Sequence, residues 1–218
     1  MNQEERTRRS RDRILEAALE LFSHQGFRAT TVREIAERAG RSTGTVYHLF
    51  SDKEEIFRVL LDQYWAAISR DDYPVTREIA AGEFPDNLEA IGFAARESVE
   101  THRRHIALIY VDVVEFEGEH IRQFYAGMAE RFRDFIDEHP QTGDPSGKLR
   151  PGITPDFAVM LASRIFLQYF AVEILFGVPN HFGQDSARVV HEIAEVLRRG
   201  MLRRADDAHG DGSRADGG

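Results

Sequence analysis

Residues 14–57 of this chain read ILEAALELFSHQGFRATTVREIAERAGRSTGTVYHLFSDKEEIF. Apolar residues recur at three- and four-residue spacing between Ile14 and Phe22, which predicts an amphipathic helix. Gly26 is expected to end this helix, because glycine adopts left-handed backbone conformations at little steric cost. Thr31 and Glu34 have the spacing of a capping box, in which each side chain accepts the other residue's free backbone N–H. A second helix is therefore predicted to begin at Thr31.

The second helix is predicted to end in the turn 39–42, Ala-Gly-Arg-Ser, and a third helix to cover residues 42–50. Ser51-Asp52-Lys53-Glu54 has the form of another capping box and is expected to open a fourth helix. Two short helices joined by a glycine-containing tight turn are typical of a helix-turn-helix motif. The third helix carries short polar side chains and a glycine outside a thin apolar anchor, so it suits close approach to the major groove of DNA.

The run from Ile14 to Phe57, about a fifth of the chain, closely resembles the DNA-binding domain of the TetR family of one-component repressors. The elements that agree are the Ala-Ala-x-x-Leu-Phe of the first helix, Gly26-Phe27, the Thr31 capping box with Ile35-Ala36, Ala39-Gly40, Tyr47, Phe50 and Lys53. The resemblance implies an all-α homodimer with an N-terminal three-helix helix-turn-helix DNA-binding domain. It also implies a C-terminal helical domain that binds a small-molecule effector and dimerises.

The DNA-contacting residues predicted from this reasoning fall into two groups. Those near base edges are Arg41, Ser42, Thr43, Thr45 and His48, and those near phosphates are Thr31, Tyr47 and Lys53, with Arg33 added to the set. The alternative for Tyr47 is an aromatic that packs in the core, and the alternative for Lys53 is a solvated surface lysine. In the family, position 41 is commonly aliphatic and position 49 often carries His or Tyr, so Arg41 and Leu49 indicate operator contacts that differ from the usual set.

Charge is distributed unevenly along the chain. Residues 1–50 hold nine arginines and seven acidic residues, whereas residues 51–218 hold 19 basic and 30 acidic residues. A slightly basic N-terminal part on an acidic remainder fits a protein whose N-terminal part binds DNA. The arginines at positions 6, 8, 9, 11 and 13 either increase solubility or form an N-terminal arm that reaches the minor groove.

The rest of the sequence predicts helices and no strands. Long helices are expected over about 86–102, 104–116, 119–138, 154–176 and 185–204, with a poorly defined region at 71–85 and a loop at 141–153. We predict a DNA-binding domain at 1–55, a ligand-binding and dimerisation domain at 56–205, and a disordered acidic tail at 206–218.

A mostly apolar effector pocket is predicted within the helices of 86–176, because phenylalanine is abundant there. The candidate lining residues are Phe93, Tyr110, Asp112, Phe116, Tyr125 and Phe166. The alternative for each ring is that it only fills the core. Asp112 lies in an otherwise apolar helix, so its carboxylate must be paired or line a polar cavity. Its expected partner is an arginine such as Arg96 or Arg164.

The helix 154–176 is apolar nearly all the way round, and the last helix carries more apolar residues than one stripe requires. A helix that is apolar on every side must be buried on every side, which predicts a homodimer that pairs both helices with their copies. The predicted interface residues are Phe170, Ile174, Val190, Ile193 and Leu197.

Composition excludes several other classes of protein. The chain has no cysteine, which excludes disulfides, thiolate metal sites and a cysteine nucleophile. Its N-terminus lacks an apolar signal segment, and its longest apolar stretch is short for a membrane span, so a cytoplasmic protein without a cofactor or a membrane partner is expected. We predict a ligand-responsive repressor of a pseudo-palindromic operator. The alternative is a helical-bundle enzyme or metal-binding protein that uses the His and Glu residues of 102–120.

Overall fold

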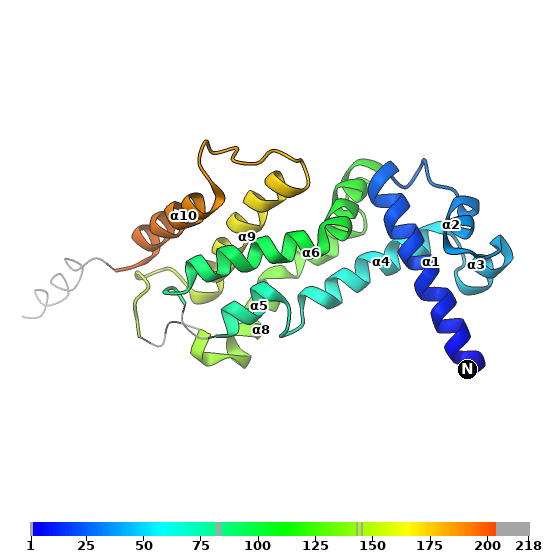
Figure 1. Ribbon diagram of the computed structural model, residues 1–218. Coiled ribbons are helices and arrows are strands. Elements are labelled where there is room, and N and C mark those ends of the chain that lie inside the picture. Colours follow the sequence, from blue (N-terminus) through cyan, green and yellow to red (C-terminus); the bar gives the residue numbers. More distant parts are fainter. Residues whose placement is uncertain (1, 82–83, 143, 145, 204–218) are drawn as a thin grey trace, which may run out of the picture. The chain divides into compact units, whose positions relative to one another are not determined.

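A computed structural model describes residues 2–81, 84–142, 144 and 146–203 of the protein. Within these residues it contains helices and no strand; the single isolated β-bridge joins Leu149 to Leu202. The helices are α1 (Gln3–Gln25), α2 (Val32–Ala39), α3 (Thr43–Leu49), α4 (Lys53–Ile68), α5 (Pro74–Ala80), α6 (Leu88–Glu115), α7 (Ile121–Ala126), α8 (Met128–Glu138), η1 (Pro140–Thr142), α9 (Pro155–Ile174) and α10 (Ser186–Met201). The predicted all-α fold is confirmed (Figure 1).

The chain divides into two compact units. Unit 1 combines residues 1–73 with 99–128, and unit 2 combines 74–98 with 129–218. Helix α6 runs through both units and departs from helical backbone geometry at His102, where φ is −108° and ψ is 17°. The predicted break between two helices near residue 103 is therefore a kink inside one helix.

Helix α1 begins eleven residues before its first buried residue, Ile14. Asn2 caps it by accepting the Glu5 N–H at 2.7 Å, and Glu4 and Glu5 place negative charge where the helix dipole is positive. The N-terminal arginines are consequently helical, so residues 3–13 do not form an extended arm.

The caps of the helix-turn-helix are largely those predicted. The Thr31–Glu34 capping box is complete, and Gly40 ends α2 in the left-handed conformation. Helix α4 differs from the prediction, because its N-cap is Asp52, which accepts the Glu55 N–H at 2.7 Å. The Glu55 carboxylate accepts the Ser51 N–H at 2.5 Å, so these contacts replace the predicted box of Ser51 and Glu54.

A core of aliphatic and aromatic side chains holds unit 1 together. Phe22, Phe27 and Phe57 have ring centroids 5.4–5.6 Å apart. Leu108 from α6 and Ile121 from α7 belong to the same buried cluster as the residues of α1 to α4. The core of the helix-turn-helix therefore includes residues far along the chain.

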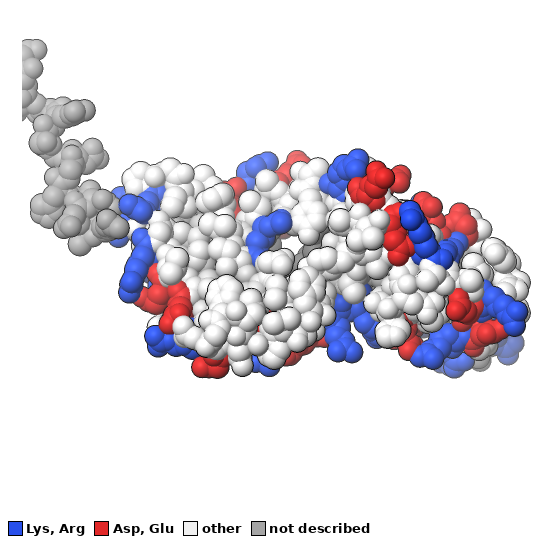
Figure 2. Space-filling view, turned by 90° about the horizontal axis from the view of Figure 1, so that it is seen from above, with Lys and Arg blue, Asp and Glu red and all other residues white. Residues whose placement is uncertain are grey.

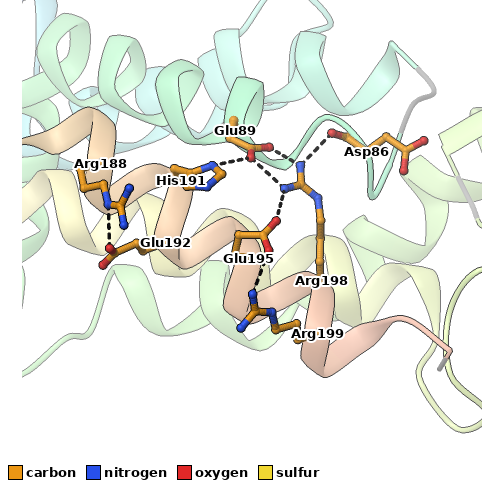
Figure 3. A network of polar contacts seen from close by, with 8 residues as sticks. All are labelled: Asp86, Glu89, Arg188, His191, Glu192, Glu195, Arg198 and Arg199. Carbon is orange, nitrogen blue, oxygen red and sulfur yellow. Dashed lines mark hydrogen bonds and ion pairs between the residues drawn. The ribbon is translucent and has the colours of Figure 1, made fainter.

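In unit 2, α9 and α10 pack with the first half of α6. A Cβ at Gly92 would lie 2.7 Å from Val190 and 3.0 Å from Phe166, so a glycine permits this close approach. A polar network joins α10 to the start of α6 (Figure 3). Arg198 donates to both carboxylate oxygens of Glu89 and to the Asp86 carbonyl, and this guanidinium is the main cause of the lowered pKa of Glu89.

Three further differences separate the structure from the sequence-based expectations. The region 71–85 contains a short helix, α5, and the helix expected over 119–138 is interrupted at Gly127, between α7 and α8. The predicted tail at 206–218 lies outside the described residues.

Candidate nucleic-acid interface

The outer face of α3 is short, polar and accessible. Val46 is buried beneath the helix, while Tyr47 is 59% exposed and His48 is exposed. Ser42 caps the helix by accepting the Thr45 N–H at 3.1 Å, and the two hydroxyls lie 2.9 Å apart. Thr43 is exposed as well. The exposed Tyr47 does not support the alternative that its ring packs in the core.

Two predicted contact residues beside α3 have partners within the chain. The Arg41 guanidinium donates to the Ser10 hydroxyl at 3.1 Å and to the Gly40 carbonyl at 2.9 Å, which ties the turn to α1. Arg33, fully exposed on α2, forms an ion pair with Glu37 at 2.8 Å. Arg41 therefore helps to position the turn before α3 through contacts within the chain.

The loop that precedes α2 is held by a carboxylate from the end of α6. Glu115 accepts the Phe27 N–H at 3.0 Å with one oxygen and the Arg28 N–H at 2.6 Å with the other. Arg28 returns a hydrogen bond from its guanidinium to the Glu115 carbonyl at 3.0 Å. Gly26 has a φ of +87°, and a Cβ there would collide with the Glu115 carboxylate, so a glycine suits both the backbone conformation and this contact.

Lys53 also binds this loop, through the loop's backbone carbonyls. Its ammonium donates to the Phe27 carbonyl at 2.7 Å and to the Thr30 carbonyl at 2.6 Å, and lies 4.1 Å from the centre of the Phe27 ring. Burial lowers the pKa of Lys53, and the nearby carboxylates of Glu115 and Glu34 oppose that effect. Two of the three ammonium donors are thus committed within the chain. The sequence had suggested either a phosphate contact or a solvated surface lysine, and neither interpretation included these hydrogen bonds to the loop.

The turn between α6 and α7 is an aromatic and polar assembly in unit 1. Asp112, fully buried, accepts from His120 Nδ1 at 2.6 Å and from the Ile121 N–H at 3.2 Å. Phe116 lies 4.6 Å from Phe27 and 5.1 Å from Phe57, measured between ring centroids. The predicted arginine partner of Asp112 is wrong, because a histidine and a backbone N–H satisfy its carboxylate.

The predicted pocket residues are divided between the two units. Phe93 and Phe166 lie in unit 2, and Tyr110, Asp112, Phe116 and Tyr125 lie in unit 1. Phe166 is fully buried against Gly92 in the core, and Phe116 packs with the aromatic core of unit 1. Phe93, Tyr110 and Tyr125 are the exposed members of the set.

Tyrosine and histidine rings gather around the kink of α6. Tyr64 lies 5.6 Å from His102 and 5.8 Å from His105, and Tyr73 lies 5.4 Å from His102. Burial is the main cause that raises the pKa of Tyr64 and lowers that of His105 to about 4, so His105 is neutral at neutral pH. Within the described part of the chain, no three His, Asp or Glu side chains are grouped so that they could share a metal ion.

Three of the predicted dimer residues face the interior of their own unit. Phe170 and Val190 are fully buried within the chain and Leu197 is 7% exposed, so they leave little surface for a second copy. Ile174 and Ile193 are half-buried, whereas Val196 is 70% exposed and Phe157 is 48% exposed. Val190 and Leu197 face the interior because α10 packs its most apolar stripe against α6 and α9.

The sequence-based reasoning missed Glu115, Arg28 and Ser10 as residues that position the helix-turn-helix. Glu115 lies 87 or more residues from its two loop partners, and no local spacing connects them. Gly26 was the available signal, because a glycine directly before a core-packing aromatic such as Phe27 can indicate that another group approaches the backbone closely.

Comparisons with known proteins agree with this geometry. The family profile described as "Bacterial regulatory proteins, tetR family" matches residues 14–60. The HTH-type transcriptional regulator YvkB of Bacillus subtilis is 27% identical over 71% of this chain and 78% of that protein. The HTH-type transcriptional repressor KstR2 of Rhodococcus jostii is 27% identical over 68% of this chain and 72% of that protein. The solved structure of NalD, the secondary repressor of a multidrug efflux pump in Pseudomonas aeruginosa, has a TM-score of 0.59 at 22% identity and covers 90% of this chain and 98% of its own.

The contacts of Lys53 predict a loss of stability when its charge is removed. Lys53→Met leaves the Phe27 and Thr30 carbonyls without their donor, and we expect the free energy of unfolding to fall by about 1–2 kcal/mol in a urea titration. Arg58→Met, at an exposed position on the same helix, is the control and should change it by less than about 0.5 kcal/mol. Unchanged stability together with a weaker salt dependence of DNA binding would instead assign Lys53 to a phosphate.

Proposed function

This chain belongs to the TetR family of bacterial transcriptional regulators, and we propose that it represses transcription by binding an operator through α3 and releasing it when a small molecule binds. The observation that carries the proposal is the outer face of α3, where Ser42, Thr43, Tyr47 and His48 are exposed above a buried Val46. Short hydroxyl side chains and a histidine can reach base edges in the major groove, and the hydroxyl of an exposed tyrosine can donate to a phosphate.

The proposed roles of the two parts of the chain are those predicted from the sequence, except that the end of α6 is added to the DNA-binding part. We propose that residues 1–55 contact DNA and that residues 56–205 bind the effector and dimerise. The contacts of Glu115 and Phe116 with the loop before α2 support the view that the DNA-binding part needs the end of α6 for its shape.

The effector is proposed to be small and mostly apolar. The support is the number of partly exposed aromatic side chains, of which Phe93, Tyr110 and Tyr125 remain candidates for its site. An effector alters DNA affinity only by its differential affinity for the DNA-binding and non-binding arrangements of the protein.

A homodimer is proposed to form through α9 and α10. Helix α9 is long and apolar enough to cross a membrane by length and composition alone, but a core helix of a soluble protein passes the same test. Six aliphatic or Met side chains of α9, and Leu175 at its C-cap, are only half-buried within the chain. The six are Met160, Leu161, Ile165, Leu167, Val172 and Ile174. Figure 2 shows a broad area without charged side chains on the face of unit 2 where the segment joining α9 and α10 lies. A second copy would bury this apolar surface.

The regulators of this family are DNA-binding proteins and not enzymes, and the alternative of a helical-bundle enzyme gains no support from the proteins that this chain resembles. A regulator that meets chromosomal DNA in a bacterium works in the cytoplasm, which is the location we propose.

Operator binding tests the proposed role of α3 directly. Tyr47→Phe removes only a hydroxyl, so we expect weaker binding to every duplex, including the DNA upstream of the protein's own gene, in a mobility-shift titration. Thr45→Ala and His48→Ala should instead change which sequences are preferred, since each base contact contributes about 1–3 kcal/mol of discrimination. Thr101→Ala, which removes a hydroxyl at an exposed position of α6, is the control and should bind like the wild type. Wild-type affinity and preference in all three α3 variants would contradict the docking.

The dimer is tested by charging the exposed positions of its proposed surface. Phe157→Glu and Val196→Glu place a carboxylate on α9 and α10 without disturbing a buried side chain. We expect each to shift a wild-type dimer towards a monomer in sedimentation at micromolar concentration, because an unpaired charge in an interface is costly. Val114→Glu, 78% exposed on α6, should leave the dimer intact. A wild-type monomer throughout that range would show that no copy covers these helices.

A further inference from the structure

The positive charge of the DNA-binding part comes from the first turns of α1. Residues 2–13 contain five arginines and three acidic residues, whereas residues 14–50 contain four of each. Helix α3 has no Lys, Arg, Asp or Glu within Thr43–Leu49. The part of the sequence that resembles a DNA-binding domain, residues 14–57, holds five basic and seven acidic residues. It therefore has no excess of positive charge, although phosphate neutralisation supplies most non-specific affinity for DNA.

The basic side chains between residues 14 and 57 are already engaged within the chain. Arg33 pairs with Glu37, Arg38 pairs with Glu20, and Arg28 donates to the Glu115 carbonyl. Arg41 and Lys53 donate to the hydroxyl and carbonyl oxygens described above. Each of these groups keeps further N–H donors, but its position is fixed by a partner inside the chain, and the charges of Arg33 and Arg38 are offset by carboxylates.

Two contacts fix the first turns of α1 beside the helix-turn-helix. Ser10 accepts from Arg41, in the turn that precedes α3. Arg11 donates to the Leu49 carbonyl at 3.4 Å and lies 4.4 Å from the centre of the Phe50 ring, at the end of α3. The start of α1 is thus attached next to both ends of α3, and its first turns extend beyond α3 (Figure 1).

Three arginines of this segment are available for an external partner. Arg6, Arg8 and Arg13 are exposed, and within the described residues their side chains make no hydrogen bond or ion pair, whereas Arg9 pairs with Glu5. Residues 3–13 are themselves exposed or half-buried, so the capped helix carries these guanidinium groups into solvent. Guanidinium groups match phosphate oxygens in geometry as well as in charge.

We propose that the helical N-terminal extension of α1, residues 3–13, is a second DNA-binding element that contacts backbone phosphates flanking the α3 site through Arg6, Arg8 and Arg13. The inference rests on the proposed function, since it assumes that α3 docks on DNA. It differs from a minor-groove arm because the segment is a helix tied to α3, which fixes its distance from the recognition site. In this arrangement α3 supplies sequence preference and α1 supplies the salt-dependent part of the affinity.

The test is the salt dependence of binding by the full-length chain. Arg6→Gln/Arg8→Gln/Arg13→Gln keeps good helix formers in place while removing three charges. The control is Arg103→Gln/Arg133→Gln/Arg199→Gln, which removes the same charge at exposed positions outside residues 1–57. Binding to a duplex of unrelated sequence and to the upstream DNA of the protein's own gene is measured between about 50 and 200 mM salt.

Each lost phosphate contact reduces the slope of log affinity against log salt by about 0.9, so we expect the α1 variant to lose roughly 2 to 3 on both duplexes. Its affinity should fall about 10- to 100-fold at roughly 0.15 M salt, while its sequence preference is retained. The control should keep the wild-type slope. An unchanged slope in the α1 variant, or an equal loss in the control, would overturn the proposal. If the wild type itself binds neither duplex, the proposed function fails, which is a separate result.

Discussion

The carboxylate of Glu115 is the contact on which the arrangement of the DNA-binding part depends. It accepts two successive backbone N–H groups, those of Phe27 and Arg28, in the loop that connects α1 to α2. The Lys53 ammonium donates to the Phe27 and Thr30 carbonyls of the same loop. A carboxylate therefore binds N–H groups of the loop, and an ammonium binds its carbonyls. Hydrogen bonds to charged groups are roughly twice as strong as neutral ones. The direction in which α2 leaves the loop, and with it the placement of α3, follows from this pair of contacts.

The same contact joins the DNA-binding residues to a helix that belongs to the rest of the chain. Helix α6 carries Glu115 at its C-terminal end and Glu89, the partner of Arg198, near its N-terminal end. Its backbone departs from helical geometry at His102, among the rings of Tyr64, Tyr73 and His105. A single covalent element therefore carries both the anchor of α10 and the anchor of the loop before α2.

The sequence predicted the elements whose causes are local and missed those whose causes are distant. Helix periodicity, Gly26 and the Thr31 capping box located the end of α1 and both ends of α2 and α3 within a few residues, because caps and apolar stripes act over single turns. The start of α1 at Gln3 was missed, because the residues before Ile14 carry no apolar stripe. The roles of Lys53 and Phe116 could not be predicted, because their partners come from other helices. Phe170 and Val190 were predicted to lie in a dimer interface, but both are buried within the chain. The apolar character of a side chain does not say whether it faces its own core or a second copy.

Amide hydrogen exchange of a Glu115→Gln variant, measured together with its operator affinity, tests the central role of this contact most directly. The amide nitrogen of glutamine cannot accept a hydrogen bond, so one loop N–H loses its partner while the size of the side chain is kept. Exchange at Phe27 and Arg28 should accelerate by about tenfold, and operator affinity should fall by a similar factor, as expected for one lost charge-assisted hydrogen bond. Glu119→Gln, at an exposed position four residues on, should change neither quantity. Wild-type exchange in the loop, or faster exchange with wild-type operator affinity, would contradict the account.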